Sequence, residues 1–261
     1  MNGKVSIALG IYSLGMAVLF IIPIIVIVII SLSGDDYLTF PPSSLSMRWF
    51  VQVTSEAGWR NSLGLSVGVG FLSAVVTLLV SAMAAYSLTR GMLVPAKAIL
   101  ALLLLPMIVP GVVSAVGMYF VSMELRLVGN PLWLALCHSI ICTPPVLLIL
   151  LTTFGGIDVN LERAGYGLGC SRWGVLRRVT LPLALPGLVS GFFVAFLGSF
   201  DEFIVSSFLM GTAGETLPVK LFQSIVYEIR PSIAAVSTII IGLACLMAVF
   251  ERIIRRALSR A

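Results

Sequence analysis

The sequence predicts an all-α protein embedded in a membrane, and composition supports this class first. The chain has 261 residues, of which 59% are hydrophobic and only 10% are charged. A water-soluble domain keeps about a quarter of its residues charged, because its surface must face water. We therefore expect most of the outer surface of this protein to face lipid, with helices that satisfy their own backbone hydrogen bonds.

Six stretches are apolar over about the 20 residues that a helix needs to cross a bilayer. In chain order they are Ile7–Leu32, Ser62–Leu88, Ala98–Met123, Pro131–Phe154, Leu188–Met210 and Ser232–Phe250. The first stretch follows Lys4 as a secretory signal would, but it is too long for a signal core and no Ala-x-Ala site follows. We interpret it as a retained span. Pro106 and Pro110 are expected to break the third span, and Pro144 and Pro145 the fourth, either along a pathway or as packing kinks.

Basic residues divide unevenly between the two ends of these spans. One side holds Lys4, Arg90, Lys97, Arg163, Arg172, Arg177, Arg178, Arg252, Arg255, Arg256 and Arg260. The basic residues of the other side are fewer and are mixed with acidic ones. Because loops rich in Lys and Arg stay in the cytoplasm, the first side is predicted to be cytoplasmic. An even number of spans then places both termini there, in a single transmembrane domain over residues 1–261.

The stretch between the fourth and fifth spans, about residues 155–186, is basic and interrupted by glycine and proline. Asp158 is expected to cap a short helix, and Gly169 is a natural left-handed stop. Ser171 can cap a second short helix, which Pro182 is expected to end, because proline has no N–H to donate. Two short helices joined by a glycine bend predict a compact knob on the cytoplasmic face.

Three interpretations of this knob compete. It is an ordinary cytoplasmic loop whose arginines touch anionic lipid, a nucleotide site at "GYGLG", or a docking element for a cytoplasmic protein. The nucleotide site is the weakest, because no strand precedes the glycines and no Lys-Ser/Thr follows them. The residues alone leave the other two interpretations open.

The stretch resembles the EAA loop of permease subunits of ABC importers that work with a binding protein. That pattern is E-A-A, three residues, Gly, nine residues, then I-x-L-P. The positions that fit it in register are Ala164, Gly169, Val179, Leu181 and Pro182. Two positions depart, since Arg163 stands where the pattern has Glu and Gly165 where it has the second Ala. Glu162 lies one residue early.

The resemblance extends over the whole chain. The number of spans and the segment "GSFDEFIVSSFLMG…ETLPVKLF" are similar to the PotC-like branch of spermidine/putrescine permeases, which have the MetI-like fold. The resemblance implies an inner-membrane permease that forms half of the pathway for a small solute, with a polyamine (putrescine or spermidine) or a related compound as the expected solute. It implies that an ATPase docks on the loop through Glu162, Arg163, Ala164, Gly165, Gly169, Trp173, Val179, Leu181 and Pro182.

The same resemblance sets the expected partners. They are a second, PotB-like permease or a second copy of this chain, two cytoplasmic ATPase subunits, a periplasmic or lipid-anchored binding protein, and membrane lipid. We expect no nucleic-acid partner. We also expect no catalytic residue, cofactor or metal in this chain, because ATP and Mg²⁺ would be used by the partner ATPase.

Asp201 and Glu202 are placed by the sequence inside the fifth span, where a charged side chain is costly. They are interpreted either as acidic groups on the pathway of a cationic solute or as paired or protonated groups near the outer interface. Neighbouring helix residues point about 100° apart, so at most one of them faces a pore squarely. His138 is expected to be a packed, hydrogen-bonded histidine rather than a metal ligand.

Other functions remain as alternatives. The chain is an importer permease for another small solute, such as a phosphonate, an opine, an amino-acid-like compound or iron. Less favoured are an ion-gradient-driven secondary transporter and a membrane scaffold. Against the secondary transporter, six spans are few and the sequence has no inverted repeat with paired broken helices.

Overall fold

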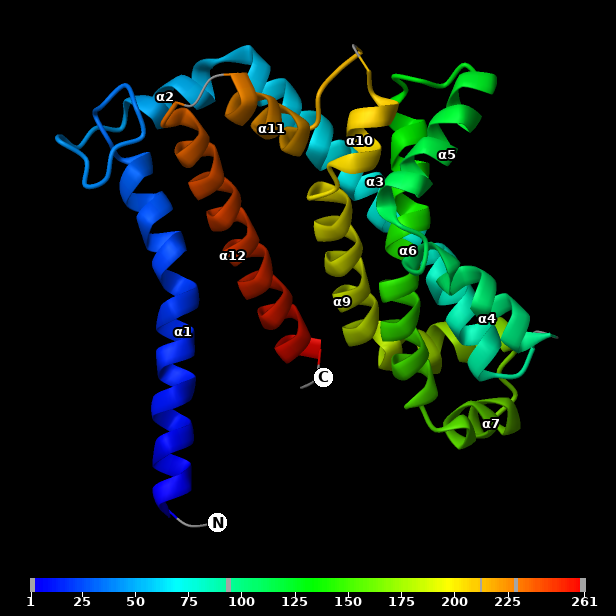
Figure 1. Ribbon diagram of the computed structural model, residues 1–261. Helices are drawn as coiled ribbons and strands as arrows, with labels where there is room; N and C mark the ends of the chain where they lie inside the picture. Colours follow the sequence, from blue (N-terminus) through cyan, green and yellow to red (C-terminus); the bar gives the residue numbers. More distant parts are fainter. Residues whose placement is uncertain (1–2, 93–94, 212, 228–229, 259–261) are drawn as a thin grey trace. The chain divides into compact units, whose positions relative to one another are not determined.

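The computed structural model is helical and describes residues 3–92, 95–211, 213–227 and 230–258 (Figure 1). Its helices are α1 (Gly3–Ser31), α2 (Arg48–Ser55), α3 (Ala57–Thr89), α4 (Ala96–Leu104), α5 (Gly111–Glu124), α6 (Pro131–Gly155), α7 (Val159–Gly167), α8 (Arg172–Val175), α9 (Leu181–Phe200), α10 (Ile204–Leu209), α11 (Leu217–Tyr227) and α12 (Ser232–Leu258). A 3₁₀ turn, η1 (Leu105–Met107), follows α4, and a π-helical segment, η2 (Leu176–Thr180), follows α8. The chain divides into two compact units, residues 1–60 with 221–244 and residues 61–220 with 245–261.

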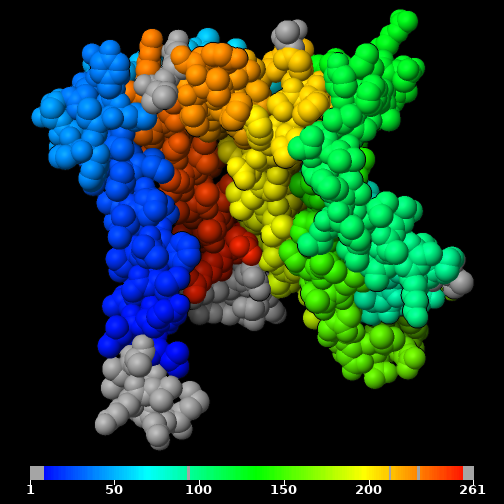
Figure 2. All heavy atoms as spheres, viewed as in Figure 1, coloured from blue at the N-terminus to red at the C-terminus, as the bar shows by residue number. Residues whose placement is uncertain are grey.

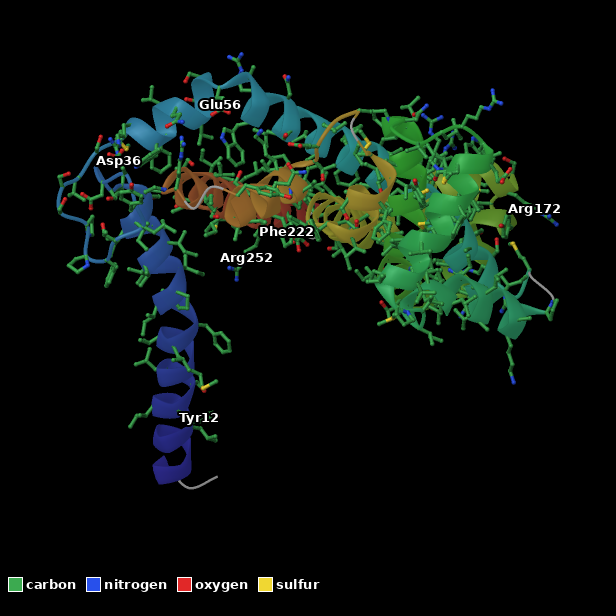
Figure 3. All side chains as sticks on the ribbon, turned by 45° about the horizontal axis from the view of Figure 1, so that its top comes forward. Tyr12, Asp36, Glu56, Arg172, Phe222 and Arg252 are labelled. Atoms are coloured by element: carbon green, nitrogen blue, oxygen red, sulfur yellow. The ribbon has the colours of Figure 1, made fainter. Side chains whose placement is uncertain are left out.

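Five of the described helical stretches are long and apolar enough to cross a membrane, and a bent pair supplies a sixth. The five are Leu9–Ser31, Ala57–Thr89, Pro131–Gly155, Arg172–Phe200 and Ser232–Ile254. The expectation of an all-α membrane protein with about six spans is therefore confirmed. Tyr12 and its apolar neighbours on α1 are exposed, as side chains of a span that face lipid or another subunit would be (Figure 3).

The third predicted span, Ala98–Met123, is not one helix. The segments Ala96–Met107 and Gly111–Glu124 meet at an angle of 100°. Pro106 lies in the 3₁₀ turn, and Pro110 precedes α5 with an extended backbone. A proline donates no backbone N–H and its ring clashes with the preceding turn, so two prolines four residues apart turn the chain sharply.

The prediction that Pro144 and Pro145 break the fourth span is wrong. Helix α6 continues through both prolines. The neighbouring helix α3 supports this region, where the Thr77 hydroxyl donates to the carbonyl of Ser139 at 3.3 Å. Thr143 donates to the same carbonyl at 2.7 Å. Membrane helices tolerate proline, although both of these bonds end on Ser139, the residue just before Ile140 and Ile141, whose carbonyls Pro144 and Pro145 leave without a backbone donor.

The fifth span is also placed differently from the prediction of Leu188–Met210. A continuous helical stretch runs from Arg172 to Phe200, so the Leu181-Pro182 pair does not end a helix. The π-helical bonding of η2 directly precedes Pro182, which lies in the first turn of α9. Proline is tolerated in the first turn of an α-helix, because the backbone N–H groups of that turn have no partner within the helix.

The core of the second unit joins helices that are distant in the sequence. Val69 of α3, Ala115 of α5, Leu134 of α6 and Val205 of α10 are buried in one apolar cluster. Along α6, helix α9 packs closely at Gly191, where an added Cβ would lie 3.2 Å from Val146 Cγ1. Small residues let membrane helices approach in this way. Helix α7 lies at the end of α6 opposite α5 and α10, and its atoms are open to view at that end in Figure 2.

In the first unit, the segment between α1 and α2 is organised by the carboxylate of Asp35. It accepts hydrogen bonds from the hydroxyls of Thr39 at 2.6 Å and Ser33 at 3.1 Å, and from the backbone N–H of Ser43 at 3.0 Å. The Ser43 hydroxyl also donates to it. The bonds from Ser43 and Thr39 hold the pKa of Asp35 well below its ordinary value.

Candidate functional site

The loop between α6 and α9, here called the docking loop (residues 155–186), contains the short helix α7 that the sequence predicts, whereas the second helix, predicted to be short, continues into the fifth span. Helix α7 begins after Asp158, whose side chain accepts from the N–H of Asn160 at 2.9 Å. Helix α8 begins after Ser171, which accepts from the N–H of Gly174 at 3.1 Å. Between them Gly169 has φ +83°, a left-handed conformation that glycine adopts without a steric penalty. The loop is therefore a defined structure with a fixed bend.

The outer surface of the docking loop is apolar and basic. Leu168 is 86% exposed and Trp173 is 67% exposed. The loop also carries four exposed arginines, Arg163, Arg172, Arg177 and Arg178, of which Arg172 lies at the outer edge of its unit in Figure 3. A large aromatic and a leucine exposed on the same loop as several cations are features of a contact surface for another molecule.

The inner side of the docking loop explains one departure from the EAA pattern. Gly165 is buried, and a Cβ at this position would lie 3.0 Å from Val175 Cγ2. Alanine would therefore require the valine to move, whereas glycine lets α7 pack closely on α8. Ala164 beside it is exposed, and Val179 is partly buried in the π-helical segment.

Glu162, which the resemblance places among the docking residues, is buried on the inner side of α7. Its carboxylate receives two hydrogen bonds from Arg90, Nε to Oε2 at 3.0 Å and Nη2 to Oε1 at 2.9 Å. The hydroxyl of Thr180 donates to Oε1 at 2.8 Å. Arg90 Nη1 also donates to the carbonyl of Phe154 at 3.2 Å. We call this group the Arg90–Glu162–Thr180 cluster.

The charge of Glu162 is maintained by this cluster. Burial raises the pKa of the carboxyl, but the hydrogen bonds from Arg90 and Thr180 and the positive charge of Arg90 outweigh it, so the pKa is lowered overall. Arg163, the next residue, points outward instead and lies 3.4 Å from the Asn160 side chain. The two charged neighbours on α7 thus have opposite surroundings, one paired inside the loop and one on its surface.

The acidic pair Asp201-Glu202 lies at a break between helices rather than within the fifth span, which corrects the sequence prediction. Helix α9 ends at Phe200, and Asp201 follows it with an exposed side chain. Glu202 is partly buried and accepts from the N–H groups of Val205 at 2.8 Å and Ser206 at 3.2 Å. The Glu202 carboxylate thereby caps the N-terminus of α10. Asp201 is therefore the member of the pair whose side chain is free to contact a solute.

His138 is held inside the second unit by hydrogen bonds, as the sequence predicted. Its Nδ1 lies 2.8 Å from the Ser199 hydroxyl, and its Nε2 lies 3.2 Å from the Ser206 hydroxyl. Glu202 Oε2 is 3.6 Å from Nε2. These contacts join α6 to both sides of the break that carries Asp201. The sequence could not pair residues that are more than 60 positions apart.

A cavity of about 390 Å³ lies between η1, α5 and α6. Its walls are nearly all apolar and include Met118, Trp133 and Ile140. Asp201 and Glu202 are not among the residues that line it. The cavity therefore offers a polycation no charged partner, and it is separate from the acidic pair.

The structure is a bundle of membrane spans with a structured basic loop, and comparison with known proteins identifies its family. Residues 92–260 match the family of inner membrane components of binding-protein-dependent transport systems. The chain belongs to this family. It is thus a non-catalytic, multi-pass inner membrane subunit of an ABC importer.

Two curated relatives show the range of solutes among similar proteins. The chain is 30% identical to the spermidine/putrescine transport system permease protein PotC of Haemophilus influenzae, over 90% of this chain and 91% of that protein. It is 31% identical to the sulfoquinovosyl glycerol transport system permease protein SmoH of Agrobacterium fabrum, over 82% and 76%. Similar proteins thus include permeases of a spermidine/putrescine system and of a sulfoquinovosyl glycerol system.

A solved structure confirms the fold. A chain of a bacterial ABC transporter involved in the import of the acidic polysaccharide alginate superposes with a TM-score of 0.74 at 18% identity. The match covers 96% of this chain and 95% of the other. At this level of identity, the likeness establishes the arrangement of helices alone.

Proposed function

We propose that this protein forms half of the translocation pathway of an ATP-driven importer and receives its driving force through the docking loop. The observation that carries the proposal is the exposed pair Leu168 and Trp173, held on a loop whose bend and caps are fixed. Two ATPase subunits on the cytoplasmic side would dock on this surface. A second permease, similar to PotB or a second copy of this chain, would supply the other half of the pathway.

The mechanism follows from the rigidity of the loop. When two ATPase subunits close on ATP, their movement must reach the membrane helices. A short helix seated in a groove of the ATPase transmits such a movement, whereas a flexible loop would absorb it. The helical stretch from Arg172 to Phe200 is continuous, so a displacement of α8 is passed directly to the fifth span. A binding protein on the opposite side would deliver the solute.

Substitutions on the exposed surface test the docking. Leu168→Ser and Trp173→Ser remove apolar contact area while Gly169 at the bend and the N-capping residues Asp158 and Ser171 stay unchanged. We expect the permease to reach the membrane normally but to lose the ATPase subunits on purification. Leu125→Ser is the matched control, because Leu125 is also an exposed apolar side chain but lies at the end of α5. ATPase retention equal to wild type in both loop variants would disprove the docking surface.

For the solute, we propose a polyamine such as putrescine or spermidine. Asp201 supports this choice, because its exposed carboxylate at the break between α9 and α10 can accept a charge-assisted hydrogen bond from an ammonium group. The similarity to PotC supports it independently. The similarity to SmoH favours a second candidate, a small neutral or anionic solute, for which Asp201 would have another role.

The two candidates differ in their response to Asp201→Asn, which keeps the shape of the side chain and removes its charge. We expect a several-fold loss of labelled putrescine or spermidine uptake in cells that express the complete importer, at unchanged membrane abundance. Ser207→Ala, at a nearby exposed position on α10, is the matched control. Unchanged polyamine uptake in Asp201→Asn would remove this residue from the pathway. Transport of only neutral or anionic solutes by the wild type would refute the proposal that the solute is a polyamine, but not the proposal that the protein is a permease.

A further inference from the structure

The Arg90–Glu162–Thr180 cluster connects four segments of the second unit that the sequence keeps apart. Arg90 follows the last turn of α3, and Glu162, 72 residues later, belongs to α7. Thr180 ends the π-helical segment, and the Phe154 carbonyl belongs to the last turn of α6. The Arg90 and Glu162 side chains are only 6% and 5% exposed. A buried ion pair thus stands where the docking loop meets the ends of two spans.

Stability alone does not account for a buried ion pair at this place. Removing two charges from water is costly, and well-packed apolar residues of similar volume often stabilise a protein as much or more. An apolar contact, however, tolerates sliding and rotation. The two parallel bonds of a guanidinium on a carboxylate fix both distance and direction. What the cluster adds over an apolar core is therefore a fixed orientation of α7 relative to α3.

The two arms of the docking loop are fastened to the same carboxylate. Helix α7 carries Glu162 itself, and the segment after α8 is bound through the Thr180 hydroxyl. Elsewhere, α7 is joined to α6 through Gly155 and Gly156 and to α8 across the Gly169 bend, and glycine allows the backbone to pivot. Without the cluster, α7 would still pack on α8 at Gly165, but it would lose its bonds to Arg90 at the end of α3.

The guanidinium of Arg90 is itself held in position on the α3 side. It lies over the Tyr86 ring at 5.7 Å, and the Tyr86 ring meets the edge of Phe154 at 5.7 Å between centroids. Its bond to the Phe154 carbonyl places a cation at the end of α6, where the helix dipole is negative. Arg90 therefore cannot follow α7 by reorienting alone, and a displacement of α7 must move the end of α3.

From this geometry, and building on the proposed function, we infer that the Arg90–Glu162–Thr180 cluster couples the docking loop to spans α3 and α6. Arg90, Glu162 and Thr180 are positioning residues. They hold the loop so that movement of a docked ATPase reaches α3 and α6 as well as the fifth span, which continues from α8. The ATPase contacts the opposite, exposed side of the loop and does not touch the cluster. Loss of the cluster should then separate ATP hydrolysis from transport while leaving docking intact.

The test uses the complete importer, with its second permease, ATPase subunits and binding protein, reconstituted in vesicles. Three variants weaken the cluster in different ways. Glu162→Gln removes the negative charge, Arg90→Lys keeps the positive charge without the paired bonds, and Thr180→Val removes one hydroxyl at constant shape. Thr180→Ser keeps that hydroxyl and is the matched control. The measurements are ATPase retention, ATP hydrolysis and solute transported per ATP hydrolysed.

We expect all four variants to retain the ATPase subunits. Solute transported per ATP should fall several-fold in Glu162→Gln, Arg90→Lys and Thr180→Val, and should be normal in Thr180→Ser. Transport per ATP equal to wild type in Thr180→Val and Glu162→Gln would overturn the inference, as would loss of the ATPase subunits in Thr180→Val. Failure of the wild-type chain to retain an ATPase would instead refute the proposed function on which the inference rests.

Discussion

Gly169 and Gly167 offer a pair of substitutions that isolates the backbone conformation of the docking loop. At both positions an added Cβ would meet nothing within 4 Å, so alanine causes no clash at either. Only Gly169 has a positive φ, +83°, whereas Gly167 is the last residue of α7. An L-residue in the left-handed region costs about 1–2 kcal/mol. Alanine in place of a helical glycine gains about 0.5–1 kcal/mol.

These magnitudes predict that Gly169→Ala weakens docking of the ATPase and that Gly167→Ala, two residues away, does not. If the strained loop of Gly169→Ala relaxes when undocked and docking restores the bend, the two alanine variants should differ by about 2 kcal/mol in docking free energy. That is about a thirtyfold ratio of dissociation constants for the ATPase, since about 1.4 kcal/mol corresponds to tenfold. Gly169→Val should be weaker still, because a β-branched side chain fits the left-handed region worst.

The assay is a titration of the ATPase subunits onto the purified permease pair in detergent, with membrane insertion checked for each variant. We expect Gly169→Ala to bind the ATPase more weakly than wild type, and Gly167→Ala to bind as well or better. Equal affinities for the two alanine variants would refute the argument that the left-handed bend is part of the docked structure.

Three further predictions concern other parts of the chain. Gly187→Ala should cost about 1–3 kcal/mol of stability by overpacking, because its Cβ would overlap the Thr153 side chain. Thr153→Ala leaves the Thr153 Cβ 2.8 Å away and should restore only part of the melting temperature, whereas Thr153→Gly removes every overlapping atom and should restore more of it. The pKa of Glu162 is lowered in the folded protein, so its carboxylate stabilises the fold above the ordinary pKa of 4.5, and this stabilisation is lost as the pH falls through the lowered pKa. The difference in melting temperature between wild type and Glu162→Gln should therefore shrink on acidification. A difference that stays constant with pH would contradict the pairing. Reporter fusions should place the chain after Arg256 in the cytoplasm and the chain near Pro42 outside, and a cytoplasmic signal at Pro42 would overturn the orientation.

Local features of the docking loop were predictable from the sequence, because each depends on a few adjacent residues. Asp158 and Ser171 cap their helices, and Gly169 adopts the left-handed bend. These outcomes follow from side-chain oxygens that reach nearby N–H groups and from the absence of a Cβ. Apolar length likewise predicted the membrane spans, since a bilayer imposes one thickness on every helix that crosses it.

The features that depend on contacts between distant segments could not be predicted in this way. Pro182 reads locally as the end of a helix, but the change of hydrogen-bond pattern in the preceding π-helical segment lets the helix continue. The sequence placed Glu162 only by its resemblance to the EAA pattern, and its pairing with Arg90 requires knowledge that the ends of α3 and α7 meet. Asp201 and Glu202 read as residues of one span, because nothing local marks the end of α9 at Phe200.

The π-helical segment makes the direction of the docking surface depend on the number of residues in a single turn. An α-helix turns by about 100° for each residue, and the wider bonding of Leu176–Thr180 accommodates one residue more than an α-helical turn would. Deleting one residue there would restore ordinary α-helical bonding and swing Trp173 about 100° around the axis of the fifth span. Among natural variants of this chain, we therefore expect substitutions within this turn to be far better tolerated than changes in its length.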